Sequence, residues 1–84
     1  MKNGFITFRS VTYAQRAESV VRRDGIGVVL QRTPKWMEEM GCGYCLRMEP
    51  GQLQRAAALL RAAGVSYRRG YVRRDNGRTE EVAL

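Results

Sequence analysis

The pattern of apolar and polar residues predicts four strands separated by helical stretches. Three short segments rich in aromatic and β-branched residues, and one segment in which apolar and polar residues alternate, each predict a strand. These segments are residues 4–9, 26–30, 44–48 and 65–74. In the third segment the side chains alternate, so Cys45 and Arg47 should lie on the sheet face opposite to Tyr44, Leu46 and Met48.

Two longer segments have apolar residues at helical spacing. In the first, Thr12 and Gln15 match a capping box, and Gly25 supplies the left-handed stop after Asp24. In the second, Pro50 opens the helix and Gly64 ends it. The predicted apolar stripes are Ala14, Ala17, Val20 and Val21 in the first helix, and Leu53, Ala56, Ala57 and Leu60 in the second. A short helix at residues 35–40 would be capped by Thr33 and Pro34.

This order predicts an α+β fold of the ferredoxin-like βαββαβ type. Its four-stranded antiparallel sheet would carry two helices on one face. Strands one and three would be central, which would place Cys45 in the middle of the sheet. Asn76-Gly77 predicts a turn, followed to Leu84 by either a return strand or a loose tail. We therefore predict one domain over residues 1–74 and a turn and tail over residues 75–84.

Length and charge narrow the possible functions. A chain of 84 residues forms a thin core with little room for an enclosed pocket. No apolar run approaches the roughly 20 residues of a membrane helix, and the first residues do not resemble a secretory signal, so we expect a cytoplasmic protein with no membrane partner. The net charge of +7 comes mostly from arginine, which favours an acidic protein surface or nucleic acid as partner.

Both cysteines lie in the segment Gly41-Cys42-Gly43-Tyr44-Cys45. Gly41 and Gly43 tolerate positive φ and would leave Cys42 open at the mouth of a strand. The chain has no histidine, which excludes a Cys/His nucleophile pair and a Cys₂His₂ zinc site within it. We expect no enzymatic turnover by this chain alone, no bound metal and no cofactor.

The motifs along the chain resemble a known family. The segments concerned are Phe5-Ile6-Thr7-Phe8, Gly25-Ile26, Thr33-Pro34, Cys42-Gly43, Leu46-Arg47 and Gly64-Val65 followed by Tyr67. Over about residues 5–71 they are similar to the small bacterial family of selenium/sulfur carrier protein-like domains. The resemblance implies that Cys42 is the acceptor thiol for a persulfide or selenium adduct. Cys45 departs from the family pattern, where a small apolar residue is expected, and is a possible auxiliary or resolving thiol.

We therefore interpret the chain as a sulfur or selenium carrier rather than an enzyme. Arg47 is a candidate for stabilising the thiolate. An arginine-rich strand and tail would dock acidic partners, which by resemblance include a cysteine desulfurase-like donor or a selenium-handling enzyme. The docking residues are Arg68, Arg69, Arg73 and Arg74. An exposed edge strand could also pair two copies into a homodimer.

Two alternatives belong to other classes. Cys42 and Cys45 have C-x-x-C spacing, but side chains three apart on a strand face opposite ways, so a disulfide needs a bend at Gly43. Alternatively, a sheet carrying Tyr67 and Tyr71 among arginines could bind nucleic acid as an RRM does. The two tyrosines have the same parity and should share one face of the sheet.

Overall fold

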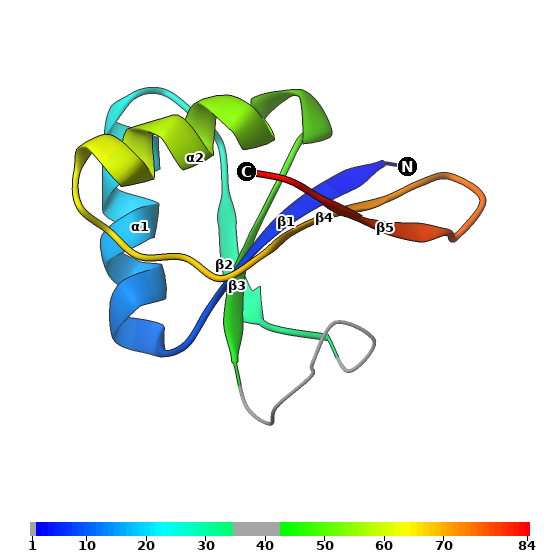
Figure 1. The fold of residues 1–84 in the computed structure, drawn as a ribbon, viewed down its shortest axis with the longest axis horizontal. Coiled ribbons are helices and arrows are strands. Elements are labelled where there is room, and N and C mark those ends of the chain that lie inside the picture. Colours follow the sequence, from blue (N-terminus) through cyan, green and yellow to red (C-terminus); the bar gives the residue numbers. More distant parts are fainter. Residues whose placement is uncertain (1, 35–42) are drawn as a thin grey trace.

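The computed structural model describes residues 2–34 and 43–84 as an α+β fold (Figure 1). The predicted short helix at 35–40, Gly41 and Cys42 lie outside the described residues. A 3₁₀ turn, η2 (Pro50–Gln52), leads into the second helix. The helices and strands are β1 (Asn3–Phe8), α1 (Val11–Arg23), β2 (Val29–Arg32), β3 (Tyr44–Met48), α2 (Leu53–Ala62), β4 (Gly70–Arg73) and β5 (Thr79–Val82).

The strands form one antiparallel sheet in the order β2-β3-β1-β4-β5. As predicted, β1 and β3 are internal strands. The first four strands have an order compatible with the expected ferredoxin-like core. The predicted four-stranded sheet is nevertheless one strand short, because residues 79–82 return along β4 as β5 instead of forming a loose tail. The Asn76-Gly77 turn that permits this return is confirmed, with Gly77 at φ 81°.

Both helices pack on the same face of the sheet, where they enclose the main core (Figure 1). The predicted stripes are confirmed, since Ala14, Ala17 and Val21 of α1 are buried, as are all four predicted residues of α2. Ile6 and Leu46 are among the sheet residues that pack against the helices in this core. The helix stops at Gly25 and Gly64 also have the expected positive φ.

The predicted start of the first helix is wrong by two residues. Ser10 is the N-cap, with extended backbone angles and a hydroxyl that accepts from the Tyr13 amide at 3.5 Å. Thr12 lies inside the first turn and therefore cannot occupy the extended cap position. The second strand also starts later than predicted, because Ile26 and Val28 are buried in the core without pairing to β3.

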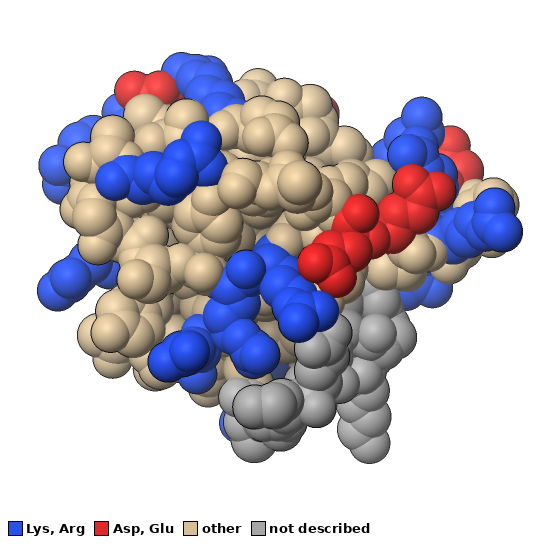
Figure 2. All heavy atoms as spheres, viewed as in Figure 1, with Lys and Arg blue, Asp and Glu red and all other residues tan. Residues whose placement is uncertain are grey.

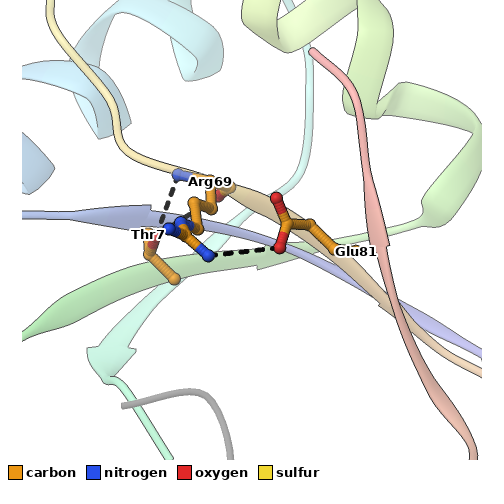
Figure 3. A network of polar contacts seen from close by, with 3 residues as sticks. All are labelled: Thr7, Arg69 and Glu81. Carbon is orange, nitrogen blue, oxygen red and sulfur yellow. Dashed lines mark hydrogen bonds and ion pairs between the residues drawn. The ribbon is translucent and has the colours of Figure 1, made fainter. Parts of the chain in front are cut away.

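The fourth strand is shorter than predicted because the chain bulges before it. Two residues, Arg68 and Arg69, lie opposite the single residue Thr7. The Arg68 amide donates to the Thr7 carbonyl, and the Thr7 amide donates to the Arg69 carbonyl, both at 2.8 Å. The Arg69 amide turns instead to the Thr7 hydroxyl at 3.1 Å, as Figure 3 shows. This is the pattern of a β-bulge, which shifts the alternation of side chains by one residue.

Candidate functional site

Cys45 lies at the centre of the sheet, on the face away from the helices. It pairs with Thr7 of β1 and with Gln31 of β2. Its side chain is 0% exposed and packs in a second, smaller cluster with Phe5 and Tyr71. The predicted alternation is confirmed, because Leu46 and Met48 belong to the main core on the other face.

Burial keeps the Cys45 thiol protonated. Removal from water raises the pKa of Cys45 to about 11. This effect is larger than the opposite effects of the polar side chains of Thr33 and Gln31 and of the positive charge of Arg47, all of which lower the pKa. The sulfhydryl points to the Arg32 carbonyl at 4.0 Å, which is a weak contact. Since the thiolate is the nucleophile, Cys45 is a poor acceptor of sulfur near neutral pH.

Two buried polar atoms lie beside this thiol. Thr33 is 8% exposed, and its hydroxyl makes no hydrogen bond of ordinary geometry with the described residues. The Arg47 Nε is also buried without a partner in this part of the chain. Arg47 is half-buried and its charge acts on Cys45. Its predicted effect on Cys42 stays a prediction.

Gly43 is placed by close packing rather than by positive φ. Positive φ is adopted by three other described glycines, namely Gly25, Gly64 and Gly77. The Gly43 carbonyl accepts from the Thr33 amide at 2.9 Å, which extends the pairing of β2 and β3. A Cβ at Gly43 would lie 3.2 Å from the Thr33 hydroxyl and 3.4 Å from the Phe8 carbonyl oxygen. Gly43 therefore lets three chain segments meet at the start of β3.

The predicted docking arginines do not form one free surface. Arg69 pairs with Glu81 at 3.3 Å, and Arg74 pairs with Glu80 at 3.1 Å, so β5 partly neutralises both (Figures 2 and 3). Arg73 is exposed at the end of β4, and Arg68 is exposed before the strand begins.

The structure brings Arg68 and Arg69 together in one hollow with Arg9, Tyr13 and Ser66, which the sequence analysis did not single out. We call this hollow the arginine groove, with a volume of about 510 Å³. It is lined by Arg9, Tyr13, Ser66, Tyr67, Arg68 and Arg69. Sequence reasoning missed Arg9 and Tyr13 because they lie more than fifty residues before Ser66 and have no local motif.

Tyr67 and Tyr71 do not share a face, contrary to the prediction from their parity. Tyr67 packs against the main core, whereas Tyr71 is 8% exposed in the cluster with Cys45. The bulge at Arg68 and Arg69 separates them, because it resets the alternation between the two tyrosines. The sheet therefore lacks the pair of exposed strand tyrosines on which the RRM alternative depended.

Neither metal binding nor membrane insertion is indicated by the described residues. Residues 2–34 and 43–84 contain no group of three or more cysteine or carboxylate side chains placed to hold a metal ion. Within the same ranges, neither helix has the length and apolar character needed to cross a membrane.

The described residues define a small α+β domain in which Gly43 leads into an internal strand that carries Cys45. The family model described as "Putative Se/S carrier protein-like" matches residues 3–72. The chain belongs to this family. The match ends within β4, so β5 lies beyond it. No curated protein matches the chain.

Proposed function

We propose that the protein is a non-catalytic carrier of sulfur or selenium in the cytoplasm, with Cys42 as the acceptor thiol. Family membership supports the class of function. The observation that selects the residue is the state of Cys45, which is fully buried and has a pKa raised to about 11. Of the two thiols of the chain, Cys45 is therefore unsuited to attack a donor, and Cys42 is the candidate that remains.

The proposed transfer is a thiol exchange. The Cys42 thiolate attacks the outer sulfur of a persulfide on the donor protein. A new S–S bond forms on Cys42 while the S–S bond of the donor breaks, and the donor thiolate leaves with the electron pair. The carrier thus gains one sulfur atom without any change in the overall oxidation state, and a selenium adduct would arise in the same way.

A cysteine desulfurase-like donor is the proposed partner, with acidic groups facing Arg68 and Arg73. Such groups would also compete with Glu80 and Glu81 for Arg74 and Arg69. β2 is an edge strand whose Val29 is 44% exposed, which supports pairing of two copies as a further proposal.

The test is intact-mass measurement after incubation with a desulfurase and cysteine. The expected product is the protein mass plus about 32 Da, the mass of one sulfur atom. Cys45→Ser should retain this gain and Cys42→Ser should lose it. Cys45→Ser is the matched control, because it removes a thiol three residues away.

Other outcomes would contradict the proposal. Loading that survives in Cys42→Ser but disappears in Cys45→Ser would assign the acceptor to the buried thiol. A loss of about 2 Da under mild oxidation, without any sulfur gain, would instead favour a C-x-x-C disulfide.

A further inference from the structure

The arginine groove is a hollow between the start of α1 and the chain that leads into β4. It has the size of a small-molecule site, at about 510 Å³. Figure 2 shows basic side chains gathered over the segment that leads into β4, beside acidic side chains on β5. Three of the basic residues, Arg9, Arg68 and Arg69, line the groove itself.

Two of these arginines lack a carboxylate partner in the part of the chain that the structure describes. Arg69 pairs with Glu81, but none of the ion pairs within residues 2–34 and 43–84 includes Arg9 or Arg68. Like charges around one hollow repel each other, and a bound dianion relieves this repulsion. The planar guanidinium group also matches the oxygens of a phosphate in a bidentate contact.

The start of α1 contributes charge of the same sign. Tyr13 lies in the first turn of this helix of 13 residues, and that turn contains no acidic side chain. The partial positive charge at a helix N-terminus favours anions. It adds here to the two arginines and would not define a site without them.

Two tyrosine side chains line the groove beside the arginines. Tyr67 is held in place, because its hydroxyl accepts from Arg61 at 2.7 Å and donates to the Leu84 carbonyl at 3.0 Å. Tyr13 is 41% exposed and offers a ring on which a planar group can stack. We propose that the arginine groove binds the phosphate group of a small molecule.

One lining residue of the groove, Arg9, lies at the same end of the sheet as Gly43. Arg9 directly follows Phe8, which pairs with Tyr44 of β3. The Phe8 carbonyl oxygen lies 3.4 Å from the position of a Cβ on Gly43. A bound phosphate would therefore lie at the end of the sheet where Gly43 leads into β3. The proposal does not require the carrier function, since anion binding is measured without any thiol chemistry.

The test is titration of the full chain with inorganic phosphate, AMP and uncharged adenosine, followed by calorimetry and by amide shifts in NMR spectra. We expect saturable binding of phosphate and AMP, no binding of adenosine, and shifts at Arg9, Ser66 and Arg68. Arg9→Gln/Arg68→Gln should weaken binding about tenfold or more, because two charged contacts are lost. The matched control Arg23→Gln/Arg78→Gln removes the same charge elsewhere and should change affinity by less than about twofold.

The variant Tyr13→Ala distinguishes a nucleotide ligand from a free phosphate ion. Tighter binding of AMP than of phosphate, with the difference lost in Tyr13→Ala, assigns a nucleotide; equal binding assigns a free oxyanion. Either result supports the proposal. Equal weakening by both double variants, or binding only of oligonucleotides, overturns it. Cys42→Ser should bind phosphate normally, so a failure here and a failure of the carrier proposal are distinguishable.

Discussion

At the scale of single residues, the two cysteines differ in what their surroundings allow. Cys45 pairs on both sides and is closed in by Phe5 and Tyr71. A thiol in such a place acts as a small apolar residue, which fits a family position where a small apolar residue was expected. The proposed carrier function therefore requires no second reactive thiol.

Cys45 should be almost inert in the folded protein. In Cys42→Ser at pH 8, we expect alkylation by iodoacetamide about a hundredfold slower in the native than in the denatured chain. The reason is that a pKa near 11 instead of 9.0 leaves about a hundredfold less thiolate. The measurement is the rate of mass gain, with Cys45→Ser as the control in which Cys42 alone is labelled.

The same shift predicts how stability depends on pH. Because the folded state holds the Cys45 proton more tightly, the free energy of unfolding should fall as pH rises from about 9 to 11, by about 2–3 kcal/mol. The free energy of unfolding is measured in urea for Cys42→Ser and for Cys42→Ser/Cys45→Ala. The difference between the two pH profiles gives the contribution of Cys45. Parallel pH profiles for the two variants would show that Cys45 titrates normally.

The side on which Cys45 lies could be predicted from sequence, but its complete burial could not. Alternation along β3 assigns the face, and this needs only local pattern. Burial depends on Phe5 and Tyr71, which come from two other strands. The position of Tyr71 in turn depends on the bulge, and no residue type between Val65 and Gly70 predicts a bulge there.

At the scale of secondary structure, the bulge is the feature that holds the start of β4 to β1. The Thr7 hydroxyl accepts from the Arg69 amide at 3.1 Å and lies 3.3 Å from the Arg69 carbonyl (Figure 3). Thr7 is buried, so loss of this hydroxyl leaves the Arg69 amide without its partner. Helix ends were easier to predict, because Gly25 and Gly64 are local signals.

Thr7→Val should therefore destabilise the protein by about 1–3 kcal/mol, although the valine side chain has nearly the same shape as the threonine side chain. Thr7→Ser retains the hydroxyl and should lose less. Both values come from urea unfolding, and hydrogen exchange at the Arg69 amide should accelerate in the valine variant only. Equal losses in the two variants would show that the methyl group, and not the hydroxyl, stabilises the bulge.

At the scale of the whole molecule, the fold class was predictable because each helix has one apolar stripe and the strands alternate with them. The sequence does not decide between a fifth strand and a loose tail, because residues 79–82 include two adjacent glutamates and show no alternation. In the structure these glutamates pair with Arg69 and Arg74 of the neighbouring strand segment. Contacts across the sheet, rather than local pattern, thus decide whether β5 forms.

The excess of positive charge should make the protein more stable in salt. Screening weakens repulsion among the arginines over distances of about 10 Å at 0.1 M salt. With a net charge of +7, we expect the Tm to rise by about 2–6 °C between 0.02 and 0.5 M NaCl. The rise should be smaller for Arg9→Gln/Arg68→Gln. A Tm that falls with salt would mean that ion pairs such as Arg55 with Asp24 outweigh the repulsion.

The bulge also has a consequence for how this sequence can vary. Val65 and Tyr67 face the helices before it, and Gly70 and Val72 face them after it. Loss of either Arg68 or Arg69 would remove the extra residue and restore simple alternation, with Val72 still facing the helices and Tyr71 still facing away from them. A change in length of one residue is therefore tolerable at the bulge, and relatives that preserve the sheet should be free to lack this single residue.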